Sequence, residues 1–132
     1  MCSTDNFCLL TIYRYTMASD FRPGKNDVQI WRNDTWRQTF VLTANNVAIN
    51  LTGAVITIQV RKGCGGTLAL TASTTDGSIT IGGASNNEIT VNKLVNIEKA
   101  KYLYDMNVVF ASGYVRTYLE GDFIVYDDVT KP

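Results

Sequence analysis

The chain has 132 residues, and its 45% hydrophobic and 18% charged content indicates one folded domain rather than a disordered segment. Its 12 basic and 12 acidic residues give a formal net charge of zero, which argues against a dedicated binder of nucleic acid or of anionic membranes. Because the sequence has no histidine, it excludes Ser-His-Asp and Cys-His catalysis within the chain and lacks a common metal ligand.

The three cysteines, Cys2, Cys8 and Cys64, make a poor disulfide framework, because their number is odd and their spacing shows no pairs. Free thiols in a reducing cytosol are the simpler interpretation, and a reactive role for Cys64 lacks a partner base. The N-terminus carries no basic leader, and the apolar run 7–12 is far too short to cross a bilayer. The sequence therefore predicts a soluble protein made in a cytosol.

Residues 1–26 are expected to form an N-terminal arm with one short strand, followed by a linker. Turn-forming residues at 19–25 separate this arm from the rest of the chain. Such an arm can add a strand to the sheet edge of its own chain or of a neighbouring subunit. Met17 also offers a second start in the same reading frame. The arm residues that we expect at an interface are Leu9, Ile12, Tyr13 and Tyr15.

The folded domain is expected to span residues 27–132 and to begin with short strands. A strand at 28–31 is followed by a turn signal at 33–34 and by a strand at 36–43. Alternate residues of the second strand share one face, which we assign to a core. They are Trp36, Phe40 and Leu42.

The segment 54–62 gives the clearest pattern of a half-buried strand. Apolar and polar residues alternate along it, so one face packs on a core and the other faces solvent. The inward set is Ala54, Ile56, Ile58 and Val60. The outward set, which together with the arm is our preferred docking surface, is Thr57, Gln59 and Arg61. The following glycine-rich segment 63–66 lacks the lysine and hydroxyl residue of a phosphate-binding loop, and we interpret it as a hairpin turn.

Three further strands are expected at 67–72, 78–81 and 88–91, with turn signals between them. Residues 93–100 then predict a short helical turn across the end of a sheet. The residues that recur there at helical spacing are Leu94, Ile97 and Ala100.

Residues 102–125 predict a long hairpin with a tight turn at 111–113. Alternate residues of both strands are apolar, so one face of this hairpin is expected in the core. That face contains Tyr102, Tyr104, Met106, Val108 and Phe110 before the turn, and Val115, Leu119, Phe123 and Val125 after it. With about seven to nine strands and almost no helix, the fold class is all-β, and a two-sheet antiparallel sandwich is favoured over a barrel.

Several segments occur in an order and at spacings that carry a family resemblance. They are Trp31-Arg32-Asn33-Asp34-Thr35-Trp36, Asn50-Leu51-Thr52-Gly53-Ala54-Val55-Ile56-Thr57, residues 77–81 with 88–91, Tyr102-Leu103-Tyr104-Asp105-Met106, and residues 113–125 followed by Asp128-Val129-Thr130. Together they resemble the immunoglobulin-like domain of phage tail and baseplate structural proteins, in particular the N-terminal domain of baseplate upper proteins. The resemblance covers residues 28–130 and departs from the family pattern at Asn33 and Lys101, where glycine is usual.

The resemblance implies an immunoglobulin-like sandwich in a non-enzymatic bacteriophage virion protein. Such a protein is a connector in the tail or baseplate that docks other virion subunits, such as fibres, and needs no cofactor. We also expect several copies in a symmetric assembly, made in the host cytoplasm, with neither nucleic acid nor membrane as a partner. Two alternatives stay open: a capsid-decoration or head-fibre protein, and a carbohydrate-binding module that recognises the host surface.

Two groups of acidic residues suggest chemistry but have simpler explanations. Asp105 with Glu120 or Asp122 suggests acid–base catalysis, although an outward residue that faces Arg116 explains Asp105 more simply. Near the C-terminus, three acids suggest a calcium site, but their spacing matches no calcium-binding loop and favours a solvated chain end. These acids are Asp122, Asp127 and Asp128.

Trp31 is the aromatic residue that we expect to be exposed. It stands one step out of phase with the apolar residues of its strand, whereas Trp36 shares a face with core residues. Trp31 is therefore a candidate anchor at a protein interface or, in the carbohydrate-binding alternative, a platform on which a sugar stacks.

Overall fold

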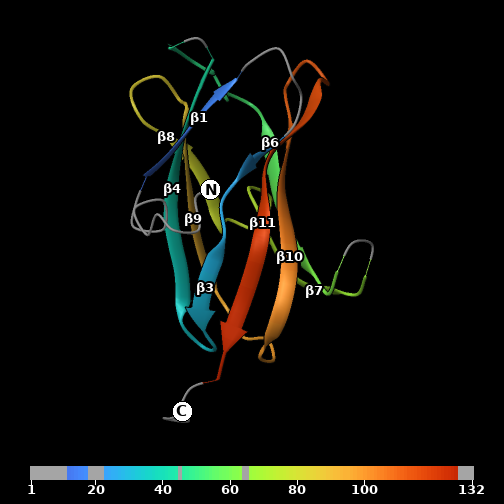
Figure 1. Cartoon of the computed structure of the whole chain (residues 1–132). Coiled ribbons are helices and arrows are strands. Elements are labelled where there is room, and N and C mark those ends of the chain that lie inside the picture. Colours follow the sequence, from blue (N-terminus) through green and yellow to red (C-terminus); the bar gives the residue numbers. More distant parts are fainter. Residues whose placement is uncertain (1–11, 18–22, 45, 64–65, 128–132) are drawn as a thin grey trace.

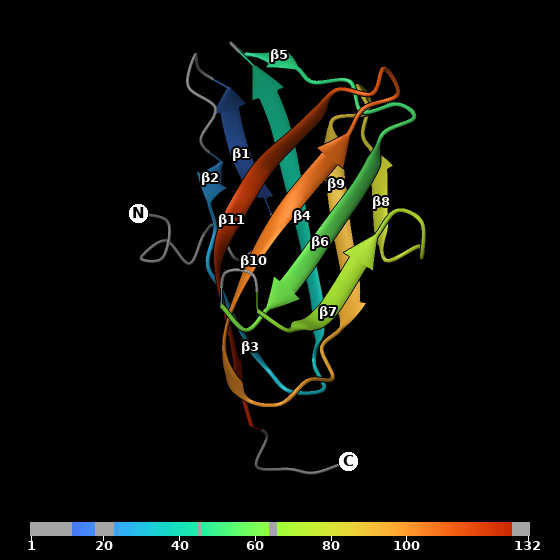
Figure 2. The same ribbon diagram turned by 90° about the vertical axis from the view of Figure 1, so that its right-hand side faces the viewer.

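The computed structural model describes residues 12–17, 23–44, 46–63 and 66–127, arranged as Figure 1 shows. Within these ranges the chain forms eleven strands and no helix, which confirms the predicted all-β class. None of the described residues belongs to a helix that could cross a membrane. The strands form two sheets, and Figure 2 shows one sheet in front of the other.

The first sheet has five strands: β1 (Ile12–Met17), β4 (Thr35–Ala44), β5 (Val47–Ala48), β8 (Ile79–Gly82) and β9 (Glu88–Leu94). Its order is β1-β4-β9-β8, and β5 pairs with the end of β4. All pairings are antiparallel except that of β1 with β4, which is parallel. The arm strand therefore lies along a sheet edge of its own chain.

The second sheet has six strands: β2 (Gly24–Lys25), β3 (Val28–Trp31), β6 (Val55–Arg61), β7 (Leu68–Ser73), β10 (Ala100–Val109) and β11 (Val115–Tyr126). Its order is β2-β11-β10-β6-β7, and β3 also pairs with β11. The two short strands β2 and β3 lie parallel to β11, whereas the predicted hairpin of β10 and β11 is antiparallel.

The strand order is that of an immunoglobulin-like sandwich. In that fold, strands B, E and D lie opposite strands G, F, C and C′. Here β4, β9 and β8 take the first set of places, and β11, β10, β6 and β7 take the second. In the described part of the chain after residue 26, eight strands (β3, β4 and β6 to β11) have four residues or more, in agreement with the expected seven to nine.

Aromatic residues from both sheets meet in the core. Trp36 of β4 lies edge-on to Tyr104 of β10 and Phe123 of β11, with ring centroids 5.7 and 5.1 Å apart. Such pairs add about 0.5–1.5 kcal/mol each to the burial of the rings. The residues predicted to face inward on β4 and β6 are all buried. Both strands are regular, so every second side chain points into the space between the two sheets.

A buried polar network ties the residue before β3 to this core. Asn26 is fully buried, and its side-chain amide donates to the hydroxyl of Tyr104 at 2.9 Å. The Tyr104 hydroxyl in turn donates to the backbone oxygen of Asn26. Gln38 accepts a hydrogen bond from the Trp36 ring nitrogen at 3.0 Å and donates to the Asn26 side chain at 3.4 Å. Asn26, at the end of the predicted linker, is thus packed inside the sandwich.

The helical turn expected at residues 93–100 is not present. β9 continues through Leu94, which is 52% exposed, and β10 begins at Ala100. Between the two strands, Val95 bonds to the turn before β4: Val95 N donates to Asp34 O at 2.9 Å, and Asn33 N donates to Val95 O at 2.7 Å. These long-range bonds replace the i to i−4 bonds that a helix needs.

A bulge in β11 changes which of its residues face the core. The register between β10 and β11 shifts by one residue at Tyr118, which is buried beside the equally buried Leu119. An extra residue of this kind reverses the inward and outward alternation on one side of it. The assignment of Val115 to the core was therefore wrong, because Val115 is 56% exposed and its neighbour Arg116 is buried.

Candidate docking surface

The outward residues predicted for β6 lie on the outer face of the six-stranded sheet, which is turned to the viewer in Figure 2. Thr57, Gln59 and Arg61 are half-buried there and alternate with fully buried residues. The guanidinium of Arg61 donates to the Gly66 backbone oxygen at 2.9 Å and to the Gln59 side-chain oxygen at 3.0 Å. These bonds hold the Arg61 side chain along the sheet surface.

Strand register fixes the pattern of side chains across this face, because cross-strand partners project on the same side of a sheet. β10 lies between β6 and β11, so each row contains one residue from each of the three strands. In order along the strands, the rows are Val55, Val109 and Val115; Thr57, Asn107 and Thr117; Gln59, Asp105 and Glu120; and Arg61, Leu103 and Asp122. One end of the face is thus apolar and the other is charged.

A groove of about 420 Å³ lies over the charged end of the face. Its lining spans four strands, from Lys25 of β2 across β11 and β10 to Arg61 of β6. The sequence pattern places Lys25 in the linker and does not indicate that it lines this groove. Lys25 reaches this face because β2 pairs parallel with β11, opposite Glu120, and no local sequence signal indicates such a long-range pairing.

Asp105 faces Glu120 across the hairpin, not Arg116 as the sequence reasoning suggested. Desolvation and then the Glu120 carboxylate raise the pKa of Asp105, and Arg61 offsets this only in part. Two carboxylates opposite each other repel, so the pair destabilises this part of the sheet unless a cation approaches it.

Large apolar side chains are exposed on the same face. Eight large hydrophobic residues are exposed in the described chain, and five of them lie on the outer side of the six-stranded sheet. These five are Trp31, Val55, Leu68, Val115 and Tyr126. They lie in three places: Val55 and Val115 at one end of the face, Leu68 beside Arg61, and Trp31 with Tyr126 beyond Asp122 at the other end.

Trp31 is exposed, as the phase of its strand predicted, at 47% of its surface. It is the register partner of Tyr126, and the two rings lie 4.9 Å apart between centroids at a tilt of 35°. Next to this pair, Arg32 Nη1 lies 3.9 Å from Asp127 Oδ1. Trp31 and Tyr126 thus form an aromatic pair at the end of the docking face.

The arm residues proposed as interface residues lie on the other sheet where they are described. Ile12, Tyr13 and Tyr15 belong to β1 and are the register partners of Thr39, Phe40 and Leu42 of β4. Leu9 lies outside the described residues. The two parts of the predicted docking surface therefore belong to different sheets.

The described acidic residues that were candidate calcium ligands form ion pairs with basic side chains. Asp122 pairs with Lys101 at 3.7 Å, and Asp127 pairs with Arg32. Asp128 lies outside the described residues. Among the residues that the structure describes, no group of three or more acidic or cysteine side chains could hold a metal ion.

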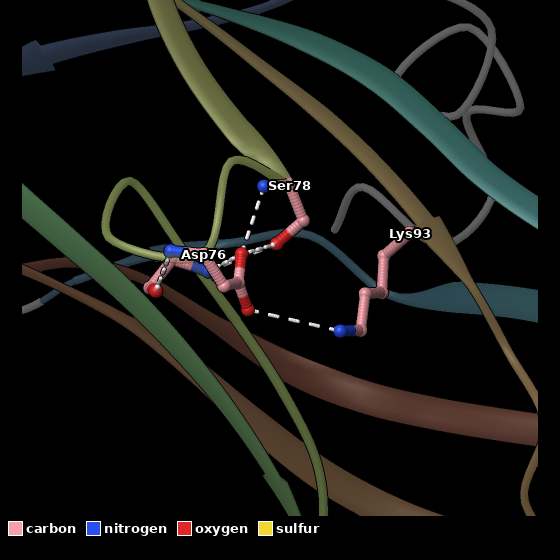
Figure 3. A network of polar contacts seen from close by, with 4 residues as sticks. Asp76, Ser78 and Lys93 are labelled. Atoms are coloured by element: carbon pink, nitrogen blue, oxygen red, sulfur yellow. Dashed lines mark hydrogen bonds and ion pairs between the residues drawn. The ribbon is translucent and has the colours of Figure 1, made fainter.

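A polar cluster fixes the crossover from β7 to β8, which connects the two sheets (Figure 3). Asp76 Oδ1 accepts bonds from the Ser78 amide at 2.8 Å, from the Ser78 hydroxyl and from the Ser73 amide at 3.3 Å. Lys93 of β9 approaches the other carboxylate oxygen at 3.7 Å. The Ser78 hydrogen bonds are the main reason that the pKa of Asp76 is lowered. This cluster stabilises the crossover between the two sheets and is not part of the docking face.

The sequence matches no protein-family model and no curated protein. Solved structures with a similar arrangement include CopC from Methylosinus trichosporium OB3b, at 13% identity and a TM-score of 0.38, where the match covers 58% of this chain and 67% of that chain. The IG1 domain of ZIG-8 in its homodimer matches at 13% identity and a TM-score of 0.40, over 84% of this chain and 87% of that chain. A chicken TCR matches at 9% identity and a TM-score of 0.42, over 83% and 56% of the two chains. Likeness at this level says nothing about what the chain does.

Proposed function

We propose that this chain is a non-enzymatic structural protein of a bacteriophage virion, a connector in the tail or baseplate that binds other virion proteins. The proposal is carried by the ordered resemblance of its sequence segments to the immunoglobulin-like domain of phage tail and baseplate proteins. In this role the outer face of the six-stranded sheet and the arm strand β1 are the docking surfaces.

The segments that carry the resemblance occupy positions where the fold restricts the choice of residue. In the segment 50–57, Asn50 Oδ1 accepts bonds from the Thr52 amide at 3.0 Å and from the Thr52 hydroxyl at 2.6 Å. Gly53 follows with a φ of +78°, a conformation that favours glycine. The Tyr-x-Tyr-Asp segment supplies Tyr104, whose hydroxyl bonds to the buried Asn26. These specific roles support a shared domain type more strongly than a shared strand pattern would.

Mass spectrometry of purified phage particles tests this proposal. We expect the chain in particles at a fixed ratio to the major tail protein, and the ratio should survive a salt wash that removes adsorbed host proteins. Absence of the chain from purified particles would contradict both the tail proposal and the capsid-decoration alternative. Labelling of the chain on intact particles then separates tail from head.

The aromatic pair at the end of the docking face favours a second candidate function, carbohydrate binding. Trp31 and Tyr126 are both partly exposed, and aromatic faces of this kind can stack on sugar rings. If the pair binds a host glycan, a glycan array should show binding that is lost in Trp31→Ala and kept in Tyr114→Ala, which changes an exposed aromatic residue of the β10–β11 turn. An array without binding that depends on Trp31 rejects this candidate.

A further inference from the structure

We propose that the outer face of the six-stranded sheet binds a second copy of this chain, through a two-fold axis that runs along β10. This inference goes beyond the proposed function, because it names one partner of the docking face and applies outside a virion as well. It rests on the way in which the rows of side chains match when one copy of the face is laid on another.

The position of β10 determines which strands meet in such a dimer. β10 lies between β6 and β11, so rotation about an axis along β10 places β6 of each copy over β11 of the other. The rotation keeps the height along the strands, so residues of one row meet residues of the same row. Sheets packed face to face lie about 10 Å apart, within reach of long side chains from both.

The charged rows are complementary in this arrangement. Arg61 of one copy faces Asp122 of the other, and Gln59 faces Glu120, with each contact made twice by the symmetry. Among the described residues, the ion pairs join Arg32 to Asp127, Lys93 to Asp76 and Lys101 to Asp122, so neither Arg61 nor Glu120 has an ion pair within one copy. A second copy brings the Asp122 carboxylate, which lies 3.7 Å from Lys101 in its own chain, over Arg61, and it brings the Gln59 amide over Glu120.

The apolar row is complementary in the same arrangement. Val55 of β6 is 44% exposed and Val115 of β11 is 56% exposed. The rotation places Val55 of each copy over Val115 of the other copy. Burying such side chains is worth about 25 cal/mol per Å² of apolar area removed from water. An axis perpendicular to the strands would instead place β6 on β6 and β11 on β11 with their directions reversed, so neither match between β6 and β11 would form.

One residue opposes the dimer. Asp105 lies on β10, next to the axis, and therefore approaches its own copy. The charged groups that surround it are Glu120 on β11, Arg61 on β6 and Lys25 on β2. Replacing Asp105 by asparagine removes the repulsion with little change in shape, so the variant Asp105→Asn should form a tighter dimer.

The size of the face predicts a weak dimer. Four strands spaced about 4.8 Å apart give the width of the face, and the seven residues of β6, at about 3.3 Å each, give its length. The face then covers on the order of 450 Å² per copy. The two copies together then bury on the order of 900 Å² or somewhat more, which is at the low end of specific interfaces. We expect a dissociation constant in the micromolar range or weaker, which an assembly with many copies would compensate by high local concentration.

Charge-reversal variants of the whole chain, measured alone and mixed, test the geometry of the dimer. Sedimentation equilibrium at protein concentrations up to about 1 mM measures their dimerisation. Arg61→Glu alone and Asp122→Lys alone each create like charges at both symmetry-related contacts, and each should weaken the dimer at least about tenfold. An equimolar mixture of the two variants should dimerise again, because the mixed dimer has one original and one reversed pair. A role of these residues in folding alone cannot produce this rescue.

Two further variants complete the test. Arg37→Glu makes the same charge change at an exposed site on β4 of the other sheet, and it should leave dimerisation unchanged. Asp105→Asn should tighten the dimer a few-fold and tests the axis even if a charge-reversal variant fails to fold. A wild-type protein that stays monomeric throughout, a mixture that dimerises no better than its components, or an equal effect of Arg37→Glu would overturn the proposal. None of these results bears on whether the chain is present in virions, which mass spectrometry tests separately.

Discussion

The backbone oxygen of Asn26 lies 2.3 Å from the position that a Cβ on Gly121 would occupy. The segment that leads into β3 thus passes directly over β11 at its glycine. Hydrogen bonds hold it there, from Asn26 N to Glu120 O at 3.0 Å and from Asp122 N to Asp27 Oδ1 at 2.9 Å. This contact links the start of the domain to its last strand and positions Lys25 beside Glu120 on the docking face.

Gly121→Ala is expected to destabilise the domain, because the added methyl group would overlap the Asn26 carbonyl and separate the two segments. Overpacking of this kind costs about 1–3 kcal/mol in the free energy of unfolding, which urea denaturation measures. Gly82→Ala in β8 is the matched control, since no atom lies within 4 Å of a Cβ there. A loss that is equally large at Gly82, or absent at Gly121, would contradict this account of the contact.

The contact between Asn26 and Gly121 also shows what sequence reasoning could not reach. The alternation of apolar residues in β4 and β6 predicts their buried faces, because a regular strand has a period of two. The pairing of β2 with β11 joins residues almost a hundred positions apart and leaves no local pattern. Residues 1–26 therefore read as arm and linker, although Asn26 is fully buried.

Two further differences arise from single residues. The bulge at Tyr118 introduces no glycine or turn signal, so a strict period of two assigns Val115 to the core when it is in fact exposed. The helical spacing of Leu94, Ile97 and Ala100 is accidental, because Leu94 and Ala100 belong to β9 and β10 and pair with other strands. The outward set on β6 followed from the sequence, but its alignment with β10 and β11 requires the strand register.

Asp76→Asn is expected to lower stability at neutral pH by about 1 kcal/mol, because the charged carboxylate accepts three hydrogen bonds in the β7–β8 crossover. The pKa of Asp76 is lowered in the folded state, so its contribution is present above the unfolded value of about 3.9 and is lost as the pH falls through the folded pKa. Urea denaturation from pH 7 to pH 2 should show the difference between wild type and variant shrinking in acid. A difference that is constant with pH would reject the electrostatic part of this explanation.

Asp105→Asn is expected to have the opposite effect on the stability of the chain. The pKa of Asp105 is raised in the folded state, so the wild type loses stability as the pH rises from about 3.9 through the folded value. At pH 7 the variant should be more stable by a few tenths of a kcal/mol up to about 1 kcal/mol, since a like-charge pair is removed. Glu120→Gln should give a similar gain, and the double variant should gain less than the sum. Additive gains would show that the two carboxylates do not interact.

Deleting residues 1–20 removes β1 and leaves the edge of β4 uncovered. An open sheet edge is a template for pairing with another strand, so the truncated protein should keep its β-sheet circular dichroism but associate more readily at high concentration. If the arm is a docking element, the truncated protein should also fail to enter phage particles. Deleting residues 1–11 alone retains β1 and is the matched control. Incorporation that is unchanged by the longer deletion would remove the docking role of the arm.

A cryo-EM map of the intact phage particle tests the central proposal most directly. The proposal predicts density for the sandwich at the tail or baseplate, with the outer face of the six-stranded sheet, around Arg61 and Glu120, in contact with another protein subunit. Particles without density for the sandwich, or a bound sandwich whose outer face is open to solvent on every copy, would contradict it.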